Sequence, residues 1–416
     1  MKKTLLFLIF CLTLLAAEAR PVSYYSAKRM GMGGTGAAVV NKEDSYFYNP
    51  AHAAIIKQSF HMPPFLLFPN SIYYGTETPD TLNKLSDIED DDESIVATYR
   101  RVIPSQVGFG GSWSSGLVFT LEDIGSFAIG TYAGGRFDAK IVNRLSPRFE
   151  GSGYFDAILP SLTFAQNVDI ESAHETWHWL RNPSIGITFK HVNRFSLYDP
   201  EEGSETVSIE VLDLDDNRVA FRAGKGYGFD IGGQAEIDTF MGLVTAAVVF
   251  NNIATNIHGI EYEPELKVTD NEDTTFSESA YSQQIPFSMT VGVAKQASPF
   301  AGLRNMRGIG WAWAALDTVF PNAVYAADIE LFLPAPRGAA DSLFKKLHFG
   351  LEQTYSVFNL FDLDWRLGLN QGYPTTGLNF NFGFWHMGLT YYTEELGKEV
   401  GEMPASYYVL HSSFVF

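Results

Sequence analysis

The chain ends in Ser406-Tyr407-Tyr408-Val409-Leu410-His411-Ser412-Ser413-Phe414-Val415-Phe416, and this stretch decides the fold. Counted back by twos, it gives Phe416, Phe414, Ser412, Leu410 and Tyr408, of which four are apolar or aromatic. A period of two with one apolar face indicates a β-strand. Similar alternation occurs upstream in Gly226–Ile237, Ile285–Gln296 and Leu363–Asn370. A soluble β-sandwich alternates in the same way, so the period by itself leaves a soluble fold and a membrane fold open.

The first nineteen residues have the features of a signal peptide. Lys2 and Lys3 precede the apolar run Leu5–Leu15, and Ala17-Glu18-Ala19 has the small residues of a cleavage site. The apolar run is too short for a transmembrane helix, and the longest later one, Met241–Phe250, is no better, because about twenty residues are needed. We therefore expect an exported protein that crosses a membrane, if at all, with strands.

The composition narrows the possible functions. With 416 residues, 46% of them apolar, the chain is suited to a sizeable folded body rather than to disorder. There are 29 Lys and Arg against 48 Asp and Glu, and a net charge of −19 argues against nucleic acid as a partner, since nucleic acid binding needs basic patches. A single cysteine, Cys11, allows neither a disulfide framework nor a cysteine-based metal cluster.

Strand number and connection length favour a membrane barrel. We expect strands near 59–69, 105–113, 124–133, 154–167, 183–194, 226–237, 241–251, 285–296, 323–333, 346–356, 363–370, 375–384, 386–393 and 406–416. Fourteen is an even number, as single-chain bacterial barrels have. The odd-to-even connections include the long segments 70–104, 134–153, 195–225, 252–284, 334–345 and 394–405. The even-to-odd ones are mostly short, although 168–182 and 297–322 are longer, and Ile309–Phe320 could be a further strand.

The fold class predicted from these features is all-β: a transmembrane antiparallel β-barrel of about 14 strands, formed by residues 57–416 in the cell outer membrane. The terminal strand is similar to the signal read by the barrel assembly machinery. In that interpretation the assembly signal consists of Tyr408, Leu410, Phe414 and Phe416.

Residues 20–56 do not look like a strand. Residues 26–51 read SAKRMGMGGTGAAVVNKEDSYFYNPA, a glycine-rich and charged segment that cannot face lipid. Gly31-x-Gly33-x-x-Gly36 spells a dinucleotide-binding fingerprint, but no hydrophobic strand precedes it, so we discount that function. We expect the segment to lie inside the barrel as a hatch, after a signal peptide of residues 1–19. Its path would be set by Gly31, Gly33, Gly34, Asn49 and Pro50.

At these residues the chain resembles the FadL-like long-chain fatty acid transporters of the outer membrane. Matches to their hatch pattern are Ala27, Gly31, Met32, Gly33, Gly34, Ala37, Asp44, Tyr48, Asn49, Pro50 and Ala51, and Leu369–Leu378 resembles a hairpin near their C-terminus. The resemblance also extends to related barrels with a secretion-shuttle role. It implies a fourteen-stranded barrel with a hatch and the passage of hydrophobic molecules. No ligand contact of the fatty-acid carriers can be matched to a residue here.

Two motifs suggest other chemistry. His174-Glu175-Thr176-Trp177-His178 spells the HExxH zinc-protease signature, but Asn182-Pro183 ends any helix soon after it, and an interfacial loop with Trp177 and Trp179 explains it more simply. The acidic runs Asp87–Glu93 and Asp213–Asn217 could bind calcium loosely, but they are more typical of solvated loops. We predict no enzyme activity, no cofactor and no metal site.

The predicted function is passive uptake of hydrophobic small molecules such as long-chain fatty acids. The alternative is a structural or secretion-partner barrel that binds proteins and transports no ligand. Expected partners are outer-membrane lipid, lipopolysaccharide, the assembly machinery and the hydrophobic substrate, with no nucleic acid. Alternation predicts a lumen lined with both charge signs, by Lys190, Asp230, Glu236, His348, Glu352, Asp364, Arg366 and Asn379.

Overall fold

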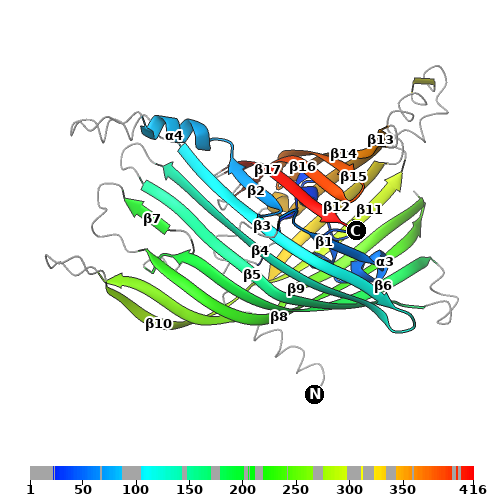
Figure 1. Cartoon of the computed structure of the whole chain (residues 1–416), viewed down its shortest axis with the longest axis horizontal. Coiled ribbons are helices and arrows are strands. Elements are labelled where there is room, and N and C mark those ends of the chain that lie inside the picture. Colours follow the sequence, from blue (N-terminus) through cyan, green and yellow to red (C-terminus); the bar gives the residue numbers. More distant parts are fainter. Residues whose placement is uncertain are drawn as a thin grey trace.

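The computed structural model of the chain describes residues 22, 24–65, 68–86, 105–142, 148–169, 179–200, 205, 207–210, 219–240, 242–265, 275–297, 311–312, 323–333, 343–357, 360–395, 400–401 and 404–416. Antiparallel pairing connects all of its strands into one sheet, and the sheet closes on itself. Within the described residues the ring has 14 strand positions, as predicted (Figure 1).

Two positions of the ring are shared by two short strands each. β1 (Ser59–Met62) and β2 (Ser71–Gly75) lie between β17 and β3, and β10 (Thr275–Gln284) and β11 (Phe287–Ala297) both pair with β9. The other strands are β3 (Ser105–Leu121), β4 (Gly125–Val142), β5 (Arg148–Asn167), β6 (Leu180–Tyr198), β8 (Ala220–Thr239), β9 (Gly242–Glu265), β12 (Ala323–Leu333), β13 (Leu347–Val357), β14 (Phe361–Asn370), β15 (Tyr373–Phe382), β16 (Trp385–Glu395) and β17 (Pro404–Val415). The short β7 (Val207–Glu210) adds to the edge of β5.

The first predicted strand, 59–69, is wrong in its second half. The chain leaves the sheet after Met62, at Pro63-Pro64, because proline has no N–H to donate to a ladder. Asn70 bridges the interruption: its Oδ1 accepts the Ser114 amide at 2.6 Å, and its carbonyl accepts the Ser412 amide at 2.7 Å. One asparagine therefore substitutes for a missing ladder residue toward both neighbouring strands.

Several strands are also longer than predicted. The segments 134–153, 195–225 and 252–284 contain the ends of β4, β5, β6, β8 and β9, which extend beyond the apolar alternation, and the whole of β10, which was not predicted. These ends form one end of the barrel together with β7 and α4 (Thr78–Ser86), as Figure 1 shows. The opposite end has the short turns 122–124, 240–241 and 383–384 and the longer connections 168–179 and 298–322. The connections predicted to be odd-to-even thus lie at one end of the barrel and the even-to-odd ones at the other, and Ile309–Phe320 lies mostly outside the described residues.

The C-terminal hairpin has a tight turn. Gln371 and Gly372 connect β14 to β15 and have φ values of +55° and +88°. Positive φ at both central residues is required by the two-residue turn whose twist matches a hairpin. From Asn370 opposite Tyr373 to Asp362 opposite Asn381, the residues of β14 then pair in direct register with β15.

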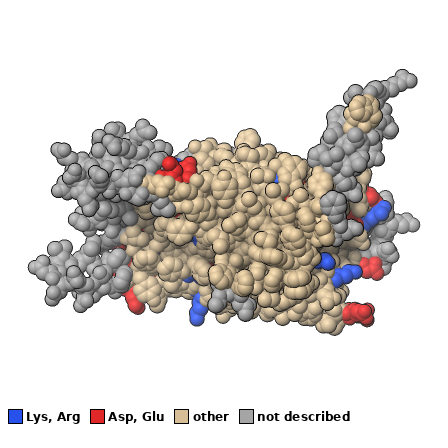
Figure 2. Space-filling view, turned by 45° about the horizontal axis from the view of Figure 1, so that its top comes forward, with Lys and Arg blue, Asp and Glu red and all other residues tan. Residues whose placement is uncertain are grey.

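The outer face of the barrel is apolar. On β17, Tyr408, Leu410 and Phe416 are 48%, 58% and 62% exposed, whereas Tyr407, Val409 and Ser413 on the alternate positions are buried. The middle of the face shown in Figure 2 is almost free of charged side chains, and these gather toward the ends. Such a band is what lipid requires of a spanning barrel.

The N-terminal segment, residues 24–56, is irregular and mostly buried. It contains α2 (Ala27–Gly31), the 3₁₀ turn η1 (Ser45–Phe47) and α3 (His52–Ile56). Ser26 begins α2, and its Oγ accepts the Arg29 amide at 3.4 Å. Among the described residues, no helix is both long enough and apolar enough to span a bilayer.

Candidate functional site

The interior of the barrel is polar and internally paired. Lys190 Nζ lies 2.8 Å from Asp230 Oδ1 and 2.7 Å from Asn252 Oδ1, with the charged side chains only 1% exposed. Arg194 makes two hydrogen bonds to Asp156, at 2.7 and 2.8 Å. Buried charges are tolerated only when they are paired in this way. The wall therefore presents neutral ion pairs to the lumen.

The eight residues predicted to line the lumen lie on strands of the barrel wall. Seven of them are buried: Lys190, Asp230, His348, Glu352, Asp364, Arg366 and Asn379. Glu236 is half-buried and accepts the side chain of Asn182 at 2.7 Å. The structure brings together Glu352, Asp364 and Arg366 on β13 and β14, whereas Lys190 and Asp230 form a separate pair on β6 and β8.

The helix α2 is anchored to β13 and β14 by charge. Lys28 Nζ lies 2.7 Å from Glu352 Oε1, and the other oxygen of Glu352 accepts Arg366 Nε at 2.7 Å. Arg366 also contacts Asp364 at 3.1 Å. Lys28 of the N-terminal segment thus joins a network of ion pairs whose other members, Glu352, Arg366 and Asp364, belong to the barrel wall.

The glycine pair after α2 fits closely against the same wall. Gly33 and Gly34 have φ values of +67° and +89°, which L side chains rarely adopt. A Cβ on Gly33 would also overlap the carbonyl oxygen of Phe349. The Gly33 carbonyl lies 2.9 Å from Nδ1 of His348. Any other residue at position 33 would therefore strain the backbone and clash with the barrel wall.

Asp328 on β12 holds the next turn. Its Oδ2 accepts the amides of Gly36 at 2.7 Å and Ala37 at 2.9 Å. The Ala37 methyl group lies against Gly292 on β11. A buried carboxylate with two backbone donors forms a strong charge-assisted contact.

The Asn49-Pro50 sequence docks on β6 and β8. Asn49 Nδ2 donates to the Ala37 carbonyl at 2.8 Å, and its Oδ1 accepts the Ala51 amide at 3.0 Å. The first of these hydrogen bonds links two turns of the N-terminal segment, and the second lies just before α3. Gly186 and Gly232 leave the space that Pro50 and Asn49 occupy.

The histidine that follows is neutral. His52 is fully buried, and its Nε2 lies 2.7 Å from Gln234 Oε1 on β8. Burial lowers the pKa of His52 to about 4, against the opposing effect of the Gln234 hydrogen bond. His52 is therefore a positioning group for α3 at neutral pH.

An aromatic cluster fills the space toward β3 and β4. Tyr24 stacks on Phe47 at 5.1 Å and meets Tyr132 edge-on at 5.1 Å, and Phe47 stacks on Tyr46 at 4.5 Å. Burial raises the pKa of Tyr46 well above its usual value, so the phenol stays neutral. The opposite side of the N-terminal segment, at α2, packs on β14–β17. The N-terminal segment therefore crosses the barrel from wall to wall.

Glycines of the barrel wall lie where the N-terminal segment contacts it. At each of them an added Cβ would meet the N-terminal segment, and they are Gly116, Gly130, Gly186, Gly232, Gly292, Gly350, Gly368 and Gly377. They come from eight different strands. Sequence reasoning missed them, and it also missed Asp328. The available signal was glycine at inward positions of strands, which points to close backbone approach.

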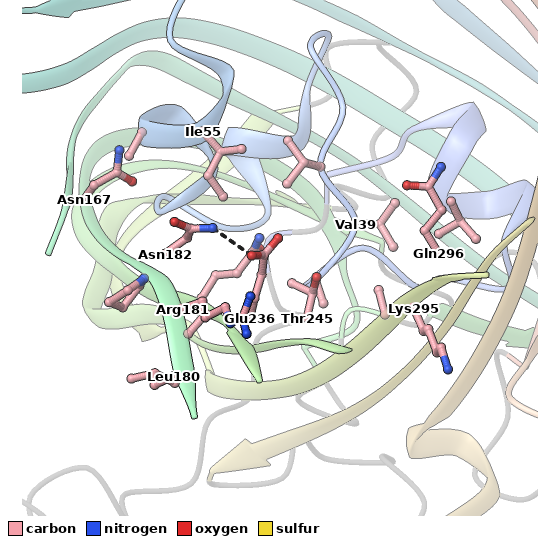
Figure 3. Close-up of a pocket in the computed structure, with 18 of the residues that line it drawn as sticks. Val39, Ile55, Asn167, Leu180, Arg181, Asn182, Glu236, Thr245, Lys295 and Gln296 are labelled. Carbon is pink, nitrogen blue, oxygen red and sulfur yellow. Dashed lines mark hydrogen bonds between the residues drawn. The ribbon is translucent and has the colours of Figure 1, made fainter. Parts of the chain in front are cut away.

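A partly open cavity of about 1370 Å³ lies between the N-terminal segment and the end of the barrel with the short turns. Val39 and Ile55 line it from the N-terminal segment, and residues of the barrel strands line it from the wall, among them Asn167, Arg181, Glu236, Thr245, Lys295 and Gln296 (Figure 3). Aliphatic and charged side chains both line it. Arg181 lies 2.6 Å from Asp238, so part of that charge is neutralised.

The zinc-protease and calcium-binding motifs considered from the sequence are not part of this site. The HExxH residues His174, Glu175 and His178 and the acidic runs 87–93 and 213–217 lie outside the described residues. Within the described part of the chain, no group of three or more His, Cys, Asp or Glu side chains could hold a metal ion.

Geometry and pairing together define a closed antiparallel β-barrel of the outer-membrane type, with an apolar outer band and an N-terminal segment crossing its interior. No protein-family model matches the sequence, and no curated protein matches it. Among solved structures, the chain is similar to a deletion mutant of the monoaromatic hydrocarbon channel TodX, with 10% identity, a TM-score of 0.50, and coverage of 94% of this chain and 98% of that one.

Two further structures are similar over comparable lengths. The Ralstonia pickettii toluene transporter TbuX has 10% identity, a TM-score of 0.49, and coverage of 94% and 97% of the two chains. The Pseudomonas aeruginosa FadL homologue has 10% identity, a TM-score of 0.45, and coverage of 96% and 98%. The FadL-like barrel fold implied by the sequence resemblance is confirmed.

Proposed function

We propose that the protein is an outer-membrane channel through which hydrophobic small molecules enter passively. The observation that carries the proposal is the N-terminal segment, which contacts strands around the barrel and is anchored by Lys28, Asp328 and Asn49. Such a segment suits a hatch of residues 20–56, in which Gly31, Gly33, Gly34, Asn49 and Pro50 set the path. Residues 1–19 would be the signal peptide.

The proposal takes further support from the similar structures. TodX is named as a monoaromatic hydrocarbon channel and TbuX as a toluene transporter. At 10% identity, the likeness to the TodX mutant shows only that the two chains share a fold. The substrate class of this protein is therefore our inference. We include long-chain fatty acids in that class. The cavity beneath the hatch, with aliphatic and charged lining, would receive the molecule after the hatch moves.

Transport is tested in liposomes containing the refolded chain. We expect saturable uptake of a labelled long-chain fatty acid or of toluene, above that of liposomes containing heat-unfolded protein. Uptake that does not saturate for either probe, together with proteins that co-purify from outer membranes, would favour the secretion-partner alternative.

The hatch is tested by conductance in planar bilayers. Deleting residues 22–50 should leave a barrel that inserts, with a larger ion conductance, because the interior contacts are removed. A deletion of residues 88–103, in the connection before β3, is the matched control and should leave conductance unchanged. Equal conductance of the hatch deletion and the full chain would refute the hatch.

A further inference from the structure

One anchor of the N-terminal segment is built entirely from titratable groups. Glu43 Oε1 lies 2.8 Å from Nε2 of His411 on β17, and its Oε2 lies 3.8 Å from Nδ1 of His386 on β16. The side chains of Glu43, His411 and His386 are 16%, 9% and 23% exposed. The contact is therefore shielded from solvent and joins the segment to the last hairpin of the barrel.

Further groups face this contact from every neighbouring element. His61 on β1 is buried, and its Nε2 has no hydrogen-bond partner among the described atoms. Beside Glu43, Asp44 accepts the Tyr48 hydroxyl at 2.7 Å with Oδ2, while its buried Oδ1 has no partner in the described structure. Arg366 on β14 adds positive charge near His411.

The second imidazole nitrogen of His411 is also engaged. Its Nδ1 lies 2.9 Å from the Ser71 hydroxyl on β2. His411 therefore connects Glu43 to both strands that close the barrel, β2 and β17. A change in the charge of this ring alters a contact at the seam where the first and last strands meet.

Glu43 stays ionised near neutral pH. Burial by itself would raise the pKa of Glu43, but the charge of His411, its close contact with the carboxylate and the nearby His386 hold this pKa well below its usual value. Histidine is the side chain whose usual charge change falls between pH 5 and 8. An imidazolium gives Glu43 a full countercharge, whereas a neutral imidazole gives only a hydrogen bond.

We propose that Glu43, His386 and His411 form a proton-sensitive latch, which holds the N-terminal segment on β16 and β17 at mildly acidic pH and loosens it as the pH rises. The proposal rests on the hatch role of the segment. With the Glu43 carboxylate 2.8 Å from His411, the docked state binds more protons than the undocked state, so raising the pH favours undocking. Below pH ~4 protonation of free Glu43 opposes docking instead.

Cysteine labelling tests the latch without any transport assay. The full chain carries Cys11→Ser and Ser45→Cys, because Ser45 is fully buried and lies two residues from Glu43. Maleimide labelling of folded protein is measured from pH 5.5 to 8.5 and divided by the rate of urea-unfolded protein at the same pH. We expect this ratio to rise about tenfold, which corresponds to a shift of about one pK unit in the docking equilibrium.

Variants separate the latch from other effects of pH. His386→Gln with His411→Gln should make the ratio independent of pH, each single variant should remove part of the rise, and Glu43→Gln should reverse its direction. His191→Gln, a histidine remote from the N-terminal segment, should behave like the parent. Folding is checked by heat-modifiable migration. If the double variant does not fold, the pH profiles of the two single variants test the latch instead. A flat parent profile, or an unchanged rise in the histidine variants, would overturn the latch and leave the uptake result unaffected.

Discussion

Asp328 on β12 accepts the backbone amide of Ala37 at 2.9 Å, across a sequence separation of 291 residues. The same oxygen accepts the amide of Gly36 at 2.7 Å. One wall carboxylate therefore fixes two consecutive peptide units of the N-terminal segment.

Replacing Asp328 with Ala should release that turn. Hydrogen bonds to a charged group contribute about 1.5–3 kcal/mol each, so we expect the N-terminal segment to dock much less tightly on the wall. The measurement is protease cleavage within residues 30–50 of the folded protein, which should accelerate at least about tenfold. Glu122→Ala, at the exposed turn after β3, is the control and should leave cleavage slow. Equal cleavage in both variants would show that Asp328 does not anchor the segment.

Gly33→Ala should destabilise the folded protein by about 3 kcal/mol. The variant combines the cost of positive φ with overlap against the carbonyl of Phe349. Gly383→Ala is a matched control, because Gly383 has φ +69° with no atom within 4 Å of an added Cβ. The control should cost only about 1–2 kcal/mol in urea unfolding in detergent. If the two variants lose the same stability, the close approach of Gly33 to the wall contributes nothing.

The pair Lys28–Glu352 should show measurable coupling. A double-mutant cycle with Lys28→Met and Glu352→Gln should give a coupling free energy of about 1–3 kcal/mol, because the pair is largely shielded from water. The exposed pair Arg181–Asp238, at 59% and 41% exposure, is the comparison and should give about 0–1 kcal/mol. Raising the salt concentration should weaken the exposed pair first. Equal coupling in the two cycles would contradict the anchoring role of Lys28.

Phe416→Asp should block assembly into the outer membrane. Phe416 stacks on Phe60 at 6.1 Å and on Phe384 at 5.7 Å, on the apolar outer face where β17 meets β1. A charge on the lipid face destabilises a barrel by about 2–4 kcal/mol for Arg or Lys at the bilayer midplane, and by less for Asp. We expect the variant to be lost from the outer-membrane fraction and its heat-modifiable form to disappear. Phe240→Ala, at an exposed turn, should assemble normally. Normal levels of the Phe416 variant would show that the terminal pattern is incidental.

Sequence periodicity predicted the barrel because its signal is local. Tyr227, Phe229 and Ile231 alternate with Gly228 and Asp230, and the structure places the first three outward. Strand ends were less predictable, since β9 continues to Glu265 through residues with little apolar alternation. The break at Pro63-Pro64 was readable in principle, because two prolines cannot continue a ladder.

The sequence did not predict which residues contact one another inside the barrel. Nothing near Asp328 in the sequence shows that its partner is Ala37, and nothing near Glu43 points to His411. Such pairs depend on the register of strands and on the path of the N-terminal segment through the closed ring. Alternation shows that a residue faces inward, but the identity of its partner needs the closed structure.

The closure of β17 onto β1 and β2 has a kinetic consequence. The N-terminal segment is synthesised first, yet its partners Glu352, Arg366 and His411 lie more than 300 residues later. These contacts can form only as the ring closes, so nearly all of the chain must be made before its beginning can fold. Folding dominated by such distant contacts is slow. The chain must therefore remain unfolded, and be protected from aggregation, until closure encloses its own N-terminus.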